Sequence, residues 1–205
     1  MSLSKVQAES IDLTATYAFS GTVSDTAARN LVLLQTLTAS SSNNLTFDTG
    51  IDNTYQSYVF KFINIHPQTD NAGFTVNFRD GGSNYDATKT TTYFYSVHTE
   101  DNSEAALGYN PNIDVHQGTG VATLATGMGS DNDQGTSGEM TLYDPSSTTF
   151  VKHFSSIVNS CERENNSNQV FASGYCNVTA AIDGVQFAAS SGNIDSGTIK
   201  LYGIL

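Results

Sequence analysis

Clustered carboxylates are the first residues whose types and spacing could do chemistry. The segment Asp131-Asn-Asp133-Gln-Gly135 is similar to a fragment of a calcium-binding loop, because calcium prefers carboxylate and amide oxygen ligands. The full spacing and the terminal Glu of an EF-hand loop are missing. We therefore favour an acidic turn without a bound metal, and a calcium site stays the alternative.

A second acidic cluster, Glu100-Asp-Asn-Ser-Glu104, could supply a general acid and a general base. The residues that follow favour a simpler interpretation. Ser103 is a good N-cap, residues 105–107 are good helix formers, and acids at the start of a helix complement its dipole. The cluster therefore predicts the solvated start of a helix of one or two turns that stops at Gly108.

Other motifs that could mark an enzyme are incomplete. Gly118-Thr-Gly120-Val-Ala-Thr123 begins like a dinucleotide-binding loop, but Thr123 replaces the third glycine and no helix pattern follows. The sequence has no nucleophile elbow, no phosphate-loop lysine and no His-Glu-x-x-His motif. Its four histidines are scattered and are interpreted as exposed or hydrogen-bonded side chains: His66, His98, His116 and His153. We expect no enzymatic activity, no catalytic residue and no cofactor.

Tyrosines are the remaining chemical candidates. Many β-sandwich modules bind sugars by stacking them on aromatic rings, and tyrosine can stack and hydrogen-bond in a chain that has no tryptophan. Tyr93, Phe94 and Tyr95 are consecutive, so in a strand one or two of them must face away from the core. Tyr93, Tyr95 and Tyr109 are the candidate glycan contacts, and filling of the core is the alternative.

The overall charge limits the classes of partner. The 205 residues include 20 Asp and Glu but only 8 Lys and Arg, for a formal net charge of −12. Binding to nucleic acid or to an anionic membrane surface requires clustered basic residues, so neither is expected. The sequence has no apolar run long enough for membrane insertion and no signal-peptide pattern at its start. We expect the protein to assemble in the cytoplasm of the cell that makes it.

The two cysteines, Cys161 and Cys176, flank a predicted hairpin whose loop lies near residues 164–168. When the two strands are paired outward from that loop, Cys176 lies opposite a residue near Phe154 and far from Cys161. Two free thiols are therefore the favoured interpretation, with at least one as a small core residue. A disulfide remains the alternative.

Alternation of apolar and polar residues predicts an all-β fold. One clear case is Phe74, Val76 and Phe78, which precede the turn signal Asp80-Gly-Gly82. The predicted strands cover residues 31–38, 44–47, 57–66, 74–79, 90–97, 120–124, 138–143, 148–158, 169–178, 182–188 and the C-terminal segment. Short strands without βαβ spacing predict a two-sheet antiparallel sandwich, with a jelly roll as the preferred topology.

The chain divides into a short arm and one domain. Residues 1–23 are predicted to be an N-terminal attachment arm or first strand, and residues 24–205 the sandwich, which starts with a helical turn at 24–29. The predicted strand at 57–66 is apolar on both faces, so we expect another layer or another subunit to cover its outer face. The candidate attachment residues are Ile11, Leu13, Tyr17 and Phe19 of the arm and Val59, Ile63 and Ile65 of this strand.

Several segments resemble those of tailed-bacteriophage virion proteins. The ending Ser196-Gly-Thr-Ile-Lys-Leu-Tyr-Gly-Ile-Leu205 is similar to the closing strand of β-rich domains in tail fibres and other exterior particle components. Residues 15–23 resemble the linker that precedes C-terminal domains of phage fibre and appendage proteins. Residues 51–67 and 145–154 are similar to segments of virion proteins from marine and freshwater phages. Fibre proteins usually carry a long shaft ahead of such a domain, and here only a short segment precedes it.

This resemblance implies a structural role rather than a catalytic one. We expect a component of the virion exterior, either capsid decoration (cement) or a short tail fibre, attached through the arm and through apolar strand faces. The implied partners are other virion proteins of the capsid or tail and further copies of the chain, with a trimer as the typical homo-oligomer. The alternative is a glycan-binding module of a tail appendage that recognises a cell-surface receptor.

Overall fold

Strands predicted from the alternation of apolar and polar residues are formed in the computed structural model, which describes residues 31–204. They are β1 (Leu31–Thr38), β2 (Leu45–Phe47), β3 (Ser57–Pro67), β4 (Ala72–Arg79), β5 (Lys89–Thr99), β6 (Ala105–Tyr109), β7 (Ala122–Met128), β8 (Thr136–Tyr143), β9 (Lys152–Cys161), β10 (Asn166–Cys176), β11 (Gly184–Ala189) and β12 (Ile194–Ile204). A short 3-10 helix, η2 (Pro111–Ile113), follows β6. The predictions for the arm, including Ile11, Leu13, Tyr17 and Phe19, lie outside the described residues, as does the helical turn at 24–29.

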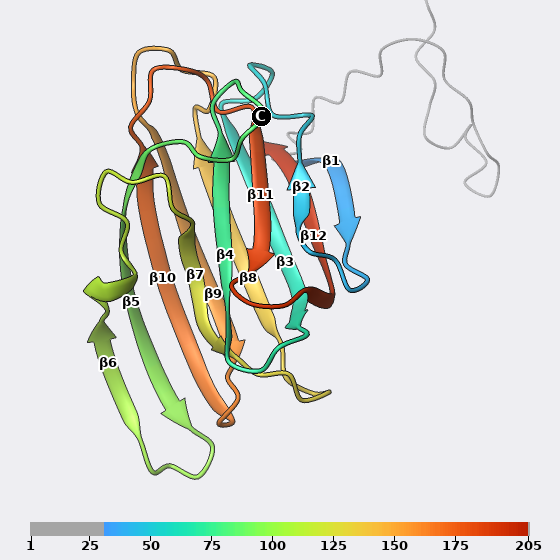
Figure 1. The fold of residues 1–205 in the computed structure, drawn as a ribbon, viewed down its shortest axis with the longest axis vertical. Helices are drawn as coiled ribbons and strands as arrows, with labels where there is room; N and C mark the ends of the chain where they lie inside the picture. The colour runs from blue at the N-terminus through green and yellow to red at the C-terminus, as the bar shows by residue number, and fades with distance from the viewer. Residues whose placement is uncertain (1–30, 205) are drawn as a thin grey trace, which may run out of the picture.

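Two antiparallel sheets form the predicted sandwich (Figure 1). The large sheet has the order β1-β12-β3-β8-β9-β10-β5-β6, and the small sheet has the order β2-β11-β4-β7. The strands β1-β12-β3-β8 and β2-β11-β4-β7 face each other in the strand order of a jelly roll, which confirms the preferred topology. The hairpins β5–β6 and β9–β10 are inserted into this scheme and extend the large sheet on one side.

The inner face of the large sheet has two halves, and they differ in what covers them. The closed half, β1-β12-β3-β8, faces the small sheet and contributes Tyr58, Phe60 and Phe62 to the core. The open half, β9-β10-β5-β6, consists of the inserted hairpins. The edge strand β7 packs over β9 and β10, while β5 and β6 lie beyond the small sheet at the left of Figure 1. This overhang positions the candidate site.

Aromatic rings fill the space between the closed half and the small sheet. Phe187 of β11 is fully buried, and its ring centroid lies 5.2 Å from those of Phe60 and Phe62. The rings of Phe47 and Phe74 lie 6.1 and 5.7 Å from it. Each of these rings removes a large apolar area from water, and most of the pairs have the edge-to-face geometry that aromatic rings prefer.

The predicted helix that ends at Gly108 is wrong, because this segment forms β6. Residues 105–109 pair antiparallel with β5, and residues 100–104 make the turn between the two strands. The Thr99 hydroxyl accepts a hydrogen bond from the Glu104 backbone N–H at 2.9 Å, which closes the turn. Helix propensity over five residues is a weak force, and pairing with β5 outweighs it. Within residues 31–204, no helix has the length and apolarity needed to cross a membrane.

The predicted placement of Ile65 on the outer face of β3 is also wrong. The pairing register of β3 shifts between Phe62 and Ile65, and Asn64 has a φ of 49°. This bulge reverses the alternation, so Ile65 points into the core and is fully buried. Val59 is on the outer face but is only 6% exposed, whereas Ile63 is 42% exposed.

Both cysteines are free thiols, as the favoured interpretation predicted. Cys176 pairs across the sheet with Lys152, two positions from the predicted Phe154, and Cys161 pairs with Ser167. Cys176 is fully buried and belongs to the hydrophobic core.

Candidate functional site

A pocket of about 270 Å³ lies on the inner face of the open half. Alternate residues of a strand share one face, so residues 93, 95 and 97 of β5 lie on the same face as their partners 172, 170 and 168 of β10, and residue 166 follows on that face. The turn between β9 and β10, the β5–β6 turn and β7 supply the remaining walls. This tyrosine–asparagine pocket is lined by Tyr93, Tyr95, Val97, Glu104, Asn110, Thr126, Glu162, Asn166 and Asn168.

Two of the three predicted glycan contacts line this pocket. The ring centroids of Tyr93 and Tyr95 are 6.3 Å apart, and the rings are tilted by 49°. The Tyr93 hydroxyl shares a 3.2 Å hydrogen bond with the Thr126 hydroxyl, and burial raises the pKa of Tyr93 to about 12. Tyr93 therefore stays a neutral phenol and forms the floor, while Tyr95 is half-buried and accessible from the pocket.

A glycine gives the Tyr95 ring its position. Gly108 of β6 lies opposite Tyr95 in the antiparallel ladder. A Cβ atom at Gly108 would lie 2.8 Å from the ring carbon Cζ and the hydroxyl of Tyr95, closer than van der Waals contact allows. The ring therefore lies across β6 only because residue 108 has no side chain.

The third predicted contact, Tyr109, lies on the opposite face of the large sheet. Tyr109 pairs with Phe94, whose side chain faces outward, and it is 56% exposed. Its hydroxyl donates a hydrogen bond to the Asp114 carboxylate. The three tyrosines thus do not form one site, and Tyr109 is separated from the pocket by the sheet.

Two asparagine amides and the Glu162 carboxylate form the polar side of the pocket. Asn168 donates from Nδ2 to Oε1 of Glu162 at 2.6 Å. Burial raises the pKa of Glu162, and hydrogen bonds from Asn168 and Asn166 partly offset this rise. Asn166 and Asn168 are 7% and 3% exposed, and the Oδ1 atom of each has no hydrogen-bond partner. Unpaired buried acceptors are uncommon in proteins, so they mark this pocket as unusual.

Sequence reasoning did not identify Glu162, Asn166 or Asn168. A signal was present in β10, where Asn166 and Asn168 occupy the same face as the core residues Val170 and Ala172. Polar residues in register with core positions indicate that the core has ended there and that a polar site begins.

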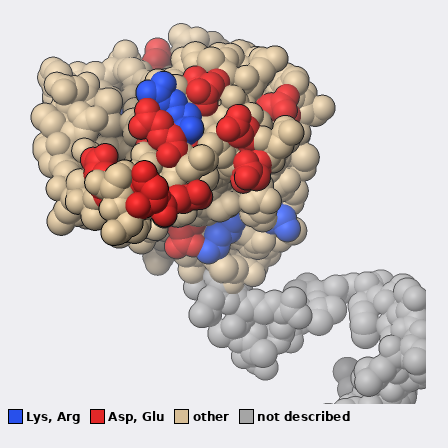
Figure 2. Space-filling view, turned by 90° about the horizontal axis from the view of Figure 1, so that it is seen from below, with Lys and Arg blue, Asp and Glu red and all other residues tan. Residues whose placement is uncertain are grey.

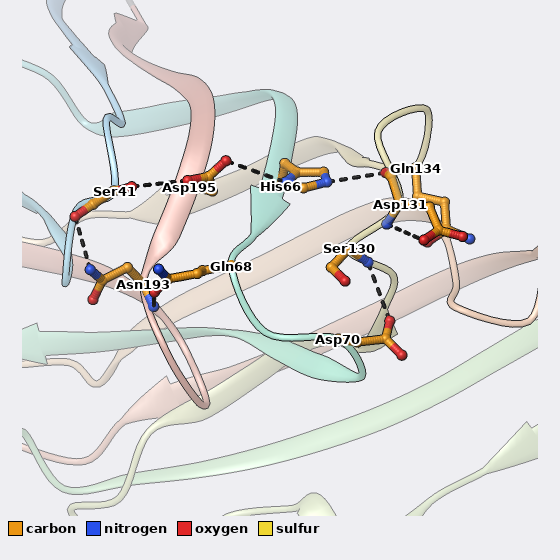
Figure 3. A network of polar contacts seen from close by, with 9 residues as sticks. All are labelled: Ser41, His66, Gln68, Asp70, Ser130, Asp131, Gln134, Asn193 and Asp195. Carbon is orange, nitrogen blue, oxygen red and sulfur yellow. Dashed lines mark hydrogen bonds and ion pairs between the residues drawn. The ribbon is translucent and has the colours of Figure 1, made fainter.

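A row of Ser, Asp and His side chains at the lower end of the sandwich does not have the geometry of a catalytic triad (Figure 3). The Ser41 hydroxyl donates to Oδ1 of Asp195 at 2.9 Å, and His66 Nδ1 lies 4.0 Å from Oδ2 of the same carboxylate. His66 Nε2 contacts the carbonyl oxygen of Asp131 at 3.1 Å. In a triad the imidazole lies between the hydroxyl and the carboxylate, whereas here the carboxylate lies in the middle. The row instead ties together the ends of β1, β3, β12 and the β7–β8 turn.

Acidic side chains gather at this same end of the molecule (Figure 2). In the turns between strands at this end, the acids are Asp70, Glu100, Asp101, Glu104, Asp131, Asp133, Glu162 and Glu164, and the one basic residue is Arg163. The segment 131–135 forms a turn in which the Gln134 N–H donates to the Asp131 carbonyl at 2.9 Å. Among the residues that the structure describes, no group of three or more His, Cys, Asp and Glu could hold a metal ion.

Both cysteines and two lysines lie buried or half-buried within the large sheet. Burial and the nearby Glu100 and Asp133 carboxylates raise the pKa of Cys161, which disfavours its thiolate. Lys89, Cys176 and Lys152 form a fully buried row across β5, β10 and β9. Lys89 Nζ donates to the Gly120 carbonyl at 2.7 Å, and Lys152 Nζ donates to the Val178 carbonyl at 2.6 Å. The two ammonium groups thus anchor neighbouring loops.

The outer face of the open half carries a second surface, formed by aromatic and aliphatic side chains. Tyr109, Phe94, Phe171 and Ile157 are consecutive cross-strand neighbours, and we call them the outer rung. Phe94 and Phe171 are stacked with ring centroids 4.8 Å apart. Phe94 is 43% exposed and Ile157 is 47% exposed. Toward the closed half the same row of the sheet continues as Glu139, Lys61 and Lys200.

Comparison of the chain with protein-family models, with curated proteins and with solved structures finds no match. The fold class that the structure defines is an all-β jelly roll extended by two hairpins. Two surfaces, the tyrosine–asparagine pocket and the outer rung, therefore carry the functional argument.

Proposed function

We propose that this protein is a non-enzymatic structural component of the exterior of a phage particle, of the capsid-decoration or short tail-fibre type. The resemblance of its segments to virion proteins suggests this role, and the observation that carries it is the outer rung. Monomeric proteins seldom expose large contiguous apolar patches, so a row of four neighbouring apolar side chains suggests an interface.

The outer rung has the properties expected of an attachment surface. Three of its four side chains lie on strands that are paired on both sides, and Tyr109 lies on the edge strand β6, so little backbone conformational entropy is lost when another surface covers them. Aromatic side chains are enriched at protein interfaces, and the rung has three of them. Attachment through an apolar strand face was expected on β3, where Ile63 alone of the three predicted residues is exposed. The proposed surface therefore lies on the open half of the same sheet.

The test of this role is whether the protein is present on particles. Antibody labelling in electron microscopy, applied to phage particles from a culture that produces this protein, should place the protein on the head or on the tail. The double variant Phe94→Ser and Phe171→Ser should fold but fail to bind particles, whereas Tyr143→Ser, an exposed tyrosine elsewhere on the same face, should bind normally. Unlabelled particles would contradict the proposed role.

The proposed assembly is a trimer. One chain has a mass of 21.9 kDa, and light scattering of the full chain should give three times this mass. A monomeric mass at micromolar concentrations would contradict a stable homo-oligomer.

The second candidate function is recognition of a cell-surface glycan. The observation that favours it is the meeting of Tyr93 and Tyr95 with unpaired polar groups in one pocket. Sugar-binding sites combine an aromatic wall with a few well-placed polar groups. A glycan array probed with the full chain should give binding that the Tyr95→Ala variant loses, and an array without binding would exclude this candidate.

A further inference from the structure

From the geometry of the tyrosine–asparagine pocket we infer that it binds one uncharged sugar ring, which donates hydrogen bonds to Asn166 and Asn168 and packs against Tyr95. This inference rests on the second candidate function and specifies the class of glycan and the atoms that bind it.

The first reason is an imbalance of hydrogen-bonding groups. The Oδ1 atoms of Asn166 and Asn168 are buried without a donor, and the two residues line the pocket. Leaving a buried acceptor unpaired costs free energy, which a donor supplied by a ligand recovers. Sugar hydroxyls are donors of the required kind, and each can also accept a hydrogen bond in return.

The second reason is charge. Of the described residues that line the pocket, none is Lys or Arg, while Glu104 and Glu162 are carboxylates. A sulfate, phosphate or carboxylate group on a sugar would enter without a countercharge and beside these acids, and like charges at such short distances repel each other. The pocket therefore selects against anionic sugars.

The third reason is the shape of the apolar wall. Tyr95 is half-buried and lines the pocket, whereas its neighbour Tyr93 is only 2% exposed, so Tyr95 supplies the accessible ring surface. A sugar ring has one face covered by C–H groups and an edge of hydroxyls, so it can meet Tyr95 and the asparagines at once. A small cation would satisfy the acceptors but would leave the ring surfaces uncovered, which favours a neutral sugar over a cation.

The volume limits the ligand to one ring in the pocket, with room for a chain outside it. About 270 Å³ is just below the range of roughly 300–1,000 Å³ that drug-sized ligands occupy. A neighbouring trough of about 400 Å³ follows the β5–β6 turn and shares Glu104 and Asn166 with the pocket. The terminal ring of a glycan would occupy the pocket, and its next ring would lie along this trough.

The experiment is saturation-transfer NMR on the full chain with single sugars as probes. Galactose, glucose, mannose and N-acetylglucosamine are the neutral probes, N-acetylneuraminic acid is the anionic probe and glucosamine is the cationic one. Tyr95→Ala removes the apolar wall, and Gly108→Ala displaces the Tyr95 ring while every polar group stays. Tyr143→Ala, which removes an exposed tyrosine from the outer face, is the matched control.

We expect at least one neutral sugar to bind, with affinity lowered about tenfold or more by Tyr95→Ala and by Gly108→Ala and unchanged by Tyr143→Ala. Preference for N-acetylneuraminic acid or for glucosamine would overturn the assignment of an uncharged ligand. Equal binding by the wild type and by both pocket variants would overturn the assignment of the site, and so would the absence of binding by every probe.

Failure of this inference can be told apart from failure of the particle role. A chain that labels phage particles but binds no sugar would retain the structural role and lose the pocket assignment. A chain that binds neutral sugars through Tyr95 but is absent from particles would retain the pocket assignment and lose the structural role.

Discussion

The closed and open halves of the large sheet use the same alternation of side chains for opposite purposes. In the closed half the inward residues are Tyr58, Phe60 and Phe62, which are nearly or fully buried against the small sheet. In the open half the inward residues change along β10 from Val170 to Asn168 and Asn166, and the outward residues become apolar. The inner face of the sheet thus changes from an apolar core in the closed half to a core that ends in a polar pocket in the open half.

This difference follows from which strands have a partner layer. The four strands of the small sheet can cover only part of an eight-stranded sheet, so the inserted hairpins extend past them. Inward positions that no layer covers gain nothing from being apolar, and polar side chains there meet solvent or a ligand. The inserted strands β9 and β10 still add Phe154, Val158 and Val170 to the core, so the polar pocket begins only where β5, β6 and the end of β10 extend beyond the small sheet.

The largest expected effect is loss of stability on truncation in the core between the closed half and the small sheet. Phe187→Ala should lower the free energy of unfolding by about 3–5 kcal/mol, because the fully buried ring contacts four other aromatic rings and leaves a cavity. Urea unfolding followed by circular dichroism measures this. A loss below about 1 kcal/mol would mean that the core can collapse around the missing ring, contrary to the rigid packing argued above.

The buried lysines of the open half should make stability depend on pH. Burial lowers the pKa of Lys89 to about 8 from the ordinary 10.5, so above pH 8 the unfolded chain binds more protons than the folded one. The free energy of unfolding should therefore rise with pH, by at most about 1.4 kcal/mol per pH unit. Burial raises the pKa of Cys176 to about 12 from 9, which opposes the rise above pH 9.

The measurement is urea unfolding at a series of pH values between 7 and 10. The unfolding free energy should rise between pH 8 and pH 9 and then level off, and Lys89→Met should reduce the rise. Lys200→Met, on the outer face, is the control and should keep it. A flat profile in the wild type would contradict a buried, easily deprotonated Lys89.

Tyr95→Ala should separate stability from binding. Because Tyr95 is half-buried at the edge of the core, its loss should cost about 1 kcal/mol of unfolding free energy, far less than Phe187→Ala. Sugar binding should nevertheless fall about tenfold or more. If Tyr95→Ala destabilises the protein as much as Phe187→Ala does, the open half is part of the structural core rather than a site.

The smallest expected effect is at the boundary between the halves on the outer face. Lys61 and Glu139 form an ion pair with side chains that are 39% and 43% exposed. Solvent screens such a pair, so Glu139→Gln should change the unfolding free energy by less than about 0.5 kcal/mol. The same urea titrations measure this change. A loss above about 1 kcal/mol would show that the Lys61–Glu139 pair contributes to the stability of the sheet on its outer face as well.

Local patterns in the sequence predict the strands, but not the places where neighbouring strands override them. Phe74, Val76 and Phe78 alternate without interruption, and β4 forms where expected. The segment that ends at Gly108 has helix-forming residues, yet it becomes β6 because β5 offers a free edge for pairing. Ile65 changes face because of a bulge at Asn64, which no periodicity reveals.

The candidate site is predictable only in part for the same reason. Tyr93 and Tyr95 share a face because residues two apart in a strand always do, so their pairing could be inferred. Their meeting with Glu162, Asn166 and Asn168 depends on β10 lying beside β5, a contact between segments about seventy residues apart. Whether a second layer covers that face depends on the size of the small sheet, which is a property of the whole fold.

Backbone NMR of the full chain titrated with a neutral sugar tests the contrast between the two halves most directly. We predict that shifts concentrate on the open half at Tyr95, Glu104, Glu162, Asn166 and Asn168, while Phe60 in the closed half and Phe187 in the small sheet stay unchanged. Shifts centred on the closed half or on the outer rung, or no shifts at saturating sugar, would contradict the account.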